Sequence, residues 1–126
     1  MQPVITIPGS RFSDMEGFYT TIYGLMNLYE DWTPSHNLDA LNDMLYSGFG
    51  TEPVRIVWEG SDKSKAALGV EATRAFYQQK INQGKPYNVG WAQEQLDALL
   101  SGKGQTLFDI IVEILNSHKH IKLELQ

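Results

Sequence analysis

The chain has 126 residues, 42% of them hydrophobic and 20% charged, with a formal net charge of −5, which is typical of one globular domain over 1–126 and excludes a disordered or collagen-like chain. Its lack of cysteine excludes disulfides, thiolate metal sites and cysteine nucleophiles. Because no apolar run could cross a bilayer and the first residues lack the features of a secretory signal, we expect a soluble, cytoplasmic protein with no membrane attachment.

The first elements in the chain are a strand and a helix. The β-branched run PVITI, residues 3–7, ends at a Pro-Gly turn and predicts a buried strand. Ser13 and Glu16 have the spacing of a capping box, so we expect a helix from about 14 to about 27. Its buried face should consist of the residues at three- and four-residue spacing, namely Met15, Phe18, Tyr19, Ile22, Leu25 and Met26.

Two further strands alternate with helices. The stretch NLDALNDML, 37–45, places its leucines on one helix face and ends at a Ser-Gly pair, and VRIVW, 54–58, predicts the second strand. Residues 107–115 predict an amphipathic last helix, and IKLEL, 121–125, predicts a terminal strand. Because helices separate the strands, the pairing should be parallel, which gives an α/β fold with a three-stranded parallel sheet and helices packed on it.

The alternation of strands and helices does not require the segment between Leu68 and Gly102. EATRAFYQQKINQ and WAQEQLDALLSG have helical character and are joined by the turn-rich GKPYNVG. We interpret 69–101 as a two-helix insertion within a single domain. Its apolar residues need burial, so the helices should dock on the domain or on a second copy in a homodimer; these residues are Phe76, Leu96, Leu99 and Leu100.

Charge is distributed unevenly along the chain. A negative field repels nucleic acid and attracts basic ligands, so an acidic region disfavours DNA or RNA binding and favours a basic protein partner. The alternative is an acidic surface that only maintains solubility. No lysine or arginine occurs from Phe12 to Val54, whereas this stretch contains Asp14, Glu16, Glu30, Asp31, Asp39, Asp43 and Glu52.

Two carboxylates share the outer face of the second helix. If the leucines face the core, Asp39, Asp43 and Tyr46 form an exposed stripe at i, i+4 and i+7. Like charges at this spacing repel by about 0.2–0.5 kcal/mol, which a basic partner would reverse. The helix dipole can explain Asp39 but has faded at Asp43, and a solvated face remains the alternative. Asp109 and Glu113 repeat the pattern on the last helix, where solvated surface is the simpler interpretation.

None of the remaining patterns predicts catalysis. Carboxylates exposed on a helix lack the burial that raises the pKa of a catalytic acid. His118, Lys119 and His120 have no carboxylate or thiolate beside them and are typical of a basic helix end rather than a metal site. The run SGKGQT, 101–106, lacks the hydroxyl residue after its lysine that a phosphate loop needs. We therefore predict a protein that is not an enzyme and has no metal or cofactor.

Several pieces of the sequence occur together in one known family. NLDALNDML with its Ser47-Gly48 end, then PVRIVW, then Ser64-Lys65, strongly resembles the barstar family of intracellular ribonuclease inhibitors. The N-terminal strand, a helix with a Ser-Asp start, and a last helix that leads into a final strand follow the same order. The resemblance covers roughly 90 residues, with 69–101 as the insertion.

This resemblance implies a protein that blocks the active site of a small basic ribonuclease, with carboxylates in place of RNA phosphates. Asp39 and Asp43 match the family's two helix aspartates, and Glu113 matches an acid on its last helix. Asn42 replaces a family aromatic, and Tyr46 replaces a threonine. An interaction module of the same fold with a non-nuclease partner is the alternative. In either case the implied partner-binding residues are Asp39, Asp43, Trp32, Tyr46, Asn42, Phe49 and Glu113.

Overall fold

The computed structural model describes residues 4–26, 34–46, 52–85 and 87–126. No helix in these ranges is long and apolar enough to cross a membrane. A short 3-10 turn, η1 (Gly9–Arg11), follows the first strand. The strands and longer helices are β1 (Val4–Pro8), α1 (Met15–Leu25), α2 (Leu38–Leu45), β2 (Val54–Glu59), α3 (Ser61–Ala67), α4 (Val70–Gln83), α5 (Val89–Leu100), α6 (Leu107–Asn116) and β3 (Ile121–Leu125).

The three strands form one sheet in the order β1-β2-β3, and both pairs are parallel. The register aligns Ile5 with Ile56 and Ile56 with Leu123, so β2 is the central strand. This arrangement confirms the predicted α/β fold with a three-stranded parallel sheet. The first strand ends at Pro8, one residue later than the sequence indicated.

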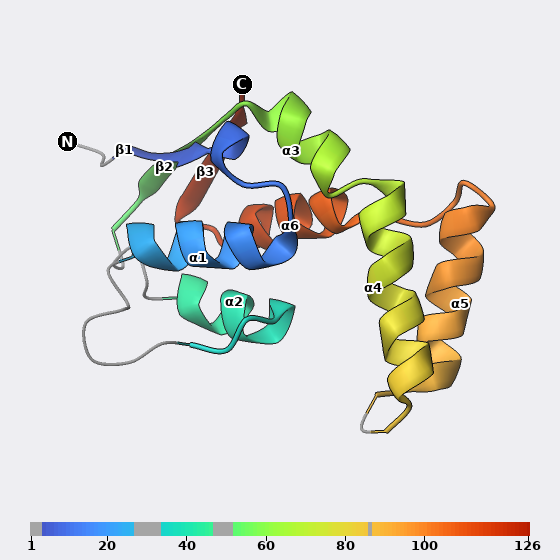
Figure 1. The fold of residues 1–126 in the computed structure, drawn as a ribbon. Coiled ribbons are helices and arrows are strands. Elements are labelled where there is room, and N and C mark those ends of the chain that lie inside the picture. Colours follow the sequence, from blue (N-terminus) through green and yellow to red (C-terminus); the bar gives the residue numbers. More distant parts are fainter. Residues whose placement is uncertain (1–3, 27–33, 47–51, 86) are drawn as a thin grey trace.

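Helices cover one face of the sheet and leave the other face more open. Figure 1 shows α1 and α6 against the sheet, with α2 packed below them. On the opposite face Arg55 donates two hydrogen bonds to Glu124, at 2.8 and 2.6 Å, which link β2 to β3. The largest fully buried side chains form the core between sheet and helices, and they are Trp58, Tyr23, Phe18, Ile7, Ile22, Leu41, Leu45, Ile56, Leu68, Leu107, Ile111 and Leu115.

The start of α1 differs from the sequence prediction. Asp14, not Ser13, is the N-cap residue, and its Oδ1 accepts a hydrogen bond from the Gly17 amide at 2.8 Å. Aspartate caps a helix as well as serine does. Because the N-cap is Asp14, the third residue of the helix is Gly17, and the capping box predicted between Ser13 and Glu16 does not form. The carboxylate of Glu16 instead contacts His36, which lies just before α2.

The helix α3 was not predicted from the sequence. Its seven residues, SDKSKAA, show no apolar periodicity. Hydrogen bonds to other elements hold the helix in place. Ser64 is fully buried, accepts a hydrogen bond from Trp58 Nε1 at 2.9 Å and donates one to the Gly9 carbonyl at 3.1 Å. This network ties α3 to the central strand and to η1.

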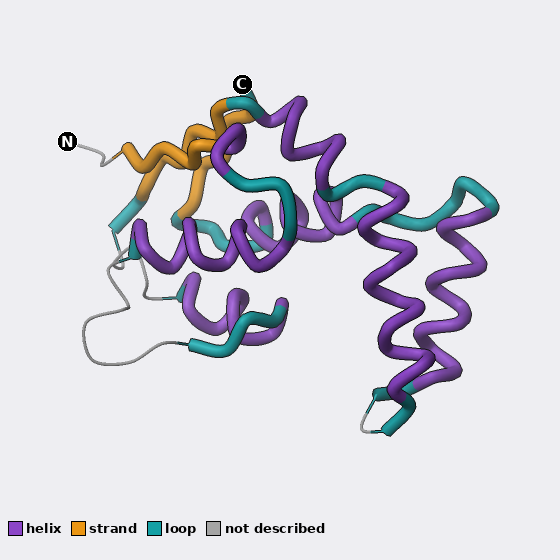
Figure 2. Tube along the Cα trace, viewed as in Figure 1, coloured by secondary structure: helices purple, strands orange, loops and turns teal. Residues whose placement is uncertain are grey.

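Helices α4 and α5 form an antiparallel hairpin that projects from the body of the protein (Figure 2). The two helices agree with the predicted helical pair. The hairpin has a small apolar core of its own, and Leu100 is 58% exposed. Two hydrogen bonds fix its base, because the Leu107 amide donates to Thr73 Oγ1 at 2.8 Å and the Phe108 amide donates to the Leu68 carbonyl at 3.1 Å. The hairpin core consists of Tyr77, Ala92, Leu96 and Leu99.

Candidate functional site

The outer face of α2 carries the predicted stripe. Asn37 begins the helix, since its Oδ1 accepts a hydrogen bond from the Ala40 amide at 2.7 Å. The leucines at 41 and 45 are fully buried, and their burial turns the opposite side of the helix to solvent. Asp39, Asp43 and Tyr46 are all exposed there, as the spacing predicted.

The half-buried Asn42 is committed to a contact inside the protein. Its Oδ1 lies 2.9 Å from Nε2 of His118, the residue that follows the C-cap of α6. The ring of Tyr46 packs edge-on against the same imidazole, with centroids 4.7 Å apart. Asn42, which was predicted as a partner-binding residue, therefore joins α2 to the junction between α6 and β3.

His118 is not the charged helix end that the sequence indicated. Only 4% of it is exposed, and burial together with the neighbouring His120 lowers its pKa below the ordinary histidine value. The prediction was wrong because a helix-end histidine is normally solvated, whereas α2 covers this one. The described part of the chain contains no group of three or more acidic, histidine or cysteine side chains that could hold a metal ion.

The acids of α6 have separate roles. Asp109 completes a capping box with Thr106 at the start of the helix, so it has a structural role. Glu113 is exposed on the same helix and accepts a hydrogen bond from Gln105 Nε2 at 2.6 Å. Of the two acids noted in the sequence, Asp109 is therefore the one whose side chain caps the helix.

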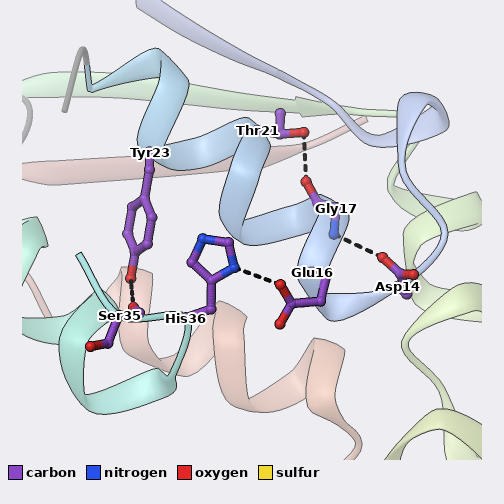
Figure 3. A network of polar contacts seen from close by, with 7 residues as sticks. All are labelled: Asp14, Glu16, Gly17, Thr21, Tyr23, Ser35 and His36. Atoms are coloured by element: carbon purple, nitrogen blue, oxygen red, sulfur yellow. Dashed lines mark hydrogen bonds and ion pairs between the residues drawn. The ribbon is translucent and has the colours of Figure 1, made fainter. Parts of the chain in front are cut away.

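A network before α2 holds the helix against α1 (Figure 3). Glu16 on α1 contacts Nδ1 of His36 at 2.7 Å, and Tyr23 donates a hydrogen bond to the Ser35 carbonyl at 3.0 Å. The His36 ring packs against Tyr19, with centroids 5.4 Å apart, and burial raises the pKa of the Tyr19 hydroxyl above its ordinary range. The start of α2 is thus fixed relative to the rest of the body.

A groove of about 1130 Å³ lies between this body and the hairpin. Figure 1 shows the N-terminal ends of α1 and α2 on the side that faces α4. Asp39, Asn42 and Glu113 all line the groove, whereas Asp43 and Tyr46 lie on α2 outside its lining. Trp32 and Phe49, the two other predicted site residues, lie outside the described residues.

The contribution of hairpin residues to the site was not predicted from the sequence. Its lining includes Phe76, Tyr77, Tyr87 and Trp91, from both helices and the turn between them. Of these, Tyr87 and Trp91 are 38% and 46% exposed. Aromatic residues at 87 and 91 are a signal in the sequence, but only the placement of the hairpin shows that they face the acids.

Comparison with known proteins agrees with this architecture. The family model described as Barstar (barnase inhibitor) matches residues 2–79, which is more than half of the chain. The chain belongs to the barstar family. No curated protein and no solved structure matches it significantly. Of the predicted partner-binding residues, Glu113 lies beyond the matched part of the chain, and the others lie within it.

Proposed function

We propose that this member of the barstar family inhibits a small basic ribonuclease by placing the acidic outer face of α2 in the enzyme's active site. The exposed pair of carboxylates on α2, opposite two fully buried leucines, is the observation that carries the proposal. No lysine or arginine occurs from Phe12 to Val54, so α1 and α2 offer no positive charge to oppose a basic partner. The family description, an inhibitor of barnase, supports a ribonuclease as the class of partner.

The inhibitory mechanism requires no chemistry by this chain. A ribonuclease binds RNA phosphates through positively charged side chains, and the carboxylates of Asp39 and Asp43 present negative oxygens to the same groups. Charge complementarity speeds association, and the stable complex then excludes RNA by occupying its site. Repulsion between the two aspartates in the free protein is relieved when cations lie against them.

Inhibition of RNA cleavage tests the proposal directly. The purified chain is titrated against a panel of small basic ribonucleases that includes barnase, at a fixed enzyme concentration. We expect activity to fall linearly to an equivalence point of about one inhibitor per enzyme with at least one panel member, because tight active-site binding is stoichiometric. Association should slow as salt is raised, since salt screens the acidic face. Full activity of every ribonuclease at excess chain would reject the proposal.

The contact of Asn42 with His118 favours a second candidate function. An α2 face in which position 42 is tied to the protein interior presents a different surface from the aromatic that the family resemblance implied. A basic protein other than a nuclease is the corresponding partner, and the chain would then act as an interaction module. Binding to a basic protein without any loss of ribonuclease activity across the panel distinguishes this candidate.

A further inference from the structure

The groove between the body and the hairpin has two chemically different walls. On the body side the lining includes four acids, Asp14, Glu16, Asp39 and Glu113. All four are exposed, and they come from the N-terminal parts of α1 and α2 and from α6. A carboxylate-rich wall attracts lysine and arginine side chains. The hairpin wall opposite is aromatic.

The aromatic wall already holds a cation. Lys80 is the one lysine of the groove lining in the described residues, and its Nζ lies 4.6 Å from the centroid of the Phe76 ring and 4.0 Å from that of Tyr87. Ring faces of this kind attract ammonium and guanidinium groups through the quadrupole of the π-system. The wall is therefore suited to the same positively charged side chains as the acids that face it.

Trp91 is the most exposed aromatic of this wall and is held firmly. Asn88 caps α5 by accepting a hydrogen bond from the Trp91 amide at 3.0 Å. The indole packs edge-on against Tyr77, which is 2% exposed, with centroids 5.8 Å apart. An aromatic that is packed against the protein and still about half exposed is the kind of anchor that dominates binding energy in protein interfaces.

The base of the hairpin keeps this wall in position. Thr73 is fully buried, accepts from the Leu107 amide and donates to the Gly69 carbonyl at 2.7 Å. This places α4 beside the start of α6, and α6 carries Glu113 on the opposite wall. A groove with walls fixed before binding loses little conformational entropy when a partner enters.

We propose that the α4–α5 hairpin is the second wall of the partner-binding site, and that a lysine- or arginine-bearing loop of the protein partner inserts between it and the acids. The inference rests on the proposed function, because the occupant is a segment of the same basic ribonuclease whose active site faces α2. Asp39 and Trp91 then contact one partner from opposite sides.

Binding to the ribonuclease inhibited most strongly in the panel tests the hairpin. Trp91→Ala and Tyr87→Ala should each raise the dissociation constant about tenfold or more. Trp91→Phe, which keeps a ring, should restore most of the affinity. Leu100→Ala is the matched control, since Leu100 is an exposed apolar residue of the same helix outside the groove lining. It should bind within about twofold of wild type.

A double variant shows whether the two walls act on one occupant. The loss caused by Asp39→Ala with Trp91→Ala together should differ from the product of the two single losses, because residues that hold a shared segment are coupled. Thermal unfolding of each variant verifies that it is folded. If Asp39→Ala weakens binding while Trp91→Ala and Tyr87→Ala bind like wild type, the hairpin inference is overturned and the inhibitory function stands.

A peptide probe separates failure of the hairpin inference from failure of the proposed function. If no ribonuclease binds, the proposed function fails, and an arginine-rich peptide is then titrated while tryptophan fluorescence is followed. A salt-sensitive change in wild type that is absent in Trp91→Phe and weakened in Asp39→Ala supports a groove that takes basic segments. The absence of any such change would remove the groove as a binding site.

Discussion

Asn42 of α2 and His118 at the end of α6 are joined side chain to side chain, with Oδ1 of the amide 2.9 Å from Nε2 of the imidazole. The contact links the helix that carries the two exposed aspartates to the segment that leads into β3. His118 is 4% exposed and packs edge-on against Tyr46, so it supports α2 where the helix meets the end of α6. One imidazole therefore contacts both α2 and the segment that leads into β3.

His118 should make the fold less stable in mild acid. The unfolded chain protonates this histidine near the ordinary pKa of about 6.5, whereas burial and His120 lower the pKa in the folded state. Between these two pKa values the unfolded state binds more protons. The contribution of His118 is therefore complete above about pH 6.5 and declines as the pH falls through the range below it.

Urea unfolding of wild type and His118→Gln at a series of pH values measures this effect. The glutamine variant keeps a donor for Asn42 but has no group that titrates in this range. Subtracting its profile removes the contributions of ionisable groups that do not interact with residue 118. The difference between the two free energies of unfolding should shrink as the pH is lowered. A constant difference across the series would show that burial does not disfavour the charged imidazole.

The elements with strong periodicity were predictable from the sequence, and the contacts between elements were not. The leucine spacing of α2 and the alternation of β3 are local signals, so both elements were found close to their observed bounds. Helix α3 depends on the buried hydrogen bonds of Ser64, and the burial of His118 depends on α2. Both therefore depend on residues distant in the chain, and the local sequence pattern predicts neither. The exposed stripe of Asp39, Asp43 and Tyr46 was predictable because it follows from the leucine spacing of α2. The groove was not predictable, because it depends on the position of the hairpin relative to α1 and α2.

Asp43→Ala separates a binding role from a structural one. Asp43 is exposed, lies beyond the first turn of α2 and sits one turn from Asp39, so its removal should leave the free energy of unfolding unchanged or slightly higher, within about 0.5 kcal/mol. Affinity for the inhibited ribonuclease should fall by tenfold or more, equivalent to about 1.4 kcal/mol or more, because a cation of the enzyme loses its partner.

Calorimetry of the free protein and of the complex measures both quantities for Asp43→Ala. Glu94→Gln is the matched control, since Glu94 is an exposed acid on α5 outside the groove lining. It should change neither quantity. Equal affinity of Asp43→Ala and wild type would exclude Asp43 from the interface, and a clear loss of stability would assign it a structural role instead.

Gly9→Ala should destabilise the fold. A Cβ atom at position 9 would lie 2.4 Å from the Glu59 carbonyl oxygen and 2.5 Å from Ser64 Oγ, so the η1 turn would have to move away from β2. Overpacking of this kind costs about 1–3 kcal/mol. Gly24→Ala is the control, because nothing lies within 4 Å of its Cβ position in α1.

Thermal unfolding of the two glycine variants should give changes of opposite sign. Gly24→Ala should stabilise the protein by about 0.4–1 kcal/mol, since alanine has less backbone freedom to lose than glycine. A Gly9→Ala protein as stable as wild type would show that the bonds among Gly9, Ser64 and Trp58 adapt without strain.

Excision of the hairpin tests our proposal that 69–101 is an insertion in the domain. The Leu68 carbonyl accepts from the Phe108 amide, so the residue before the segment lies beside the start of α6. The loop of residues 102–106, which is kept, can therefore reconnect the chain after the excision. We expect the shortened chain to keep its sheet but to be less stable, because the buried Leu107 amide loses Thr73 Oγ1, a cost of about 1–3 kcal/mol.

Circular dichroism and light scattering measure the outcome of the excision. A cooperative unfolding transition at lower temperature is the expected result. An unfolded product would contradict the insertion proposal and make the hairpin an essential part of the domain. If wild type is a dimer and the shortened chain is a monomer, the hairpin also supplies the contact between copies.

The strands β2 and β3 are neighbours in the sheet, although the whole of α3 to α6 lies between them in the chain. For a flexible connection, the entropy of loop closure rises only with the logarithm of length, by about 0.6 kcal/mol for each doubling. The far tip of the hairpin, around Gly84, can therefore gain or lose residues with almost no effect on whether the sheet closes. Under the proposal that the hairpin is a wall of the partner-binding site, changes in the length of this tip would alter which partners fit while the three strands and their register stay the same.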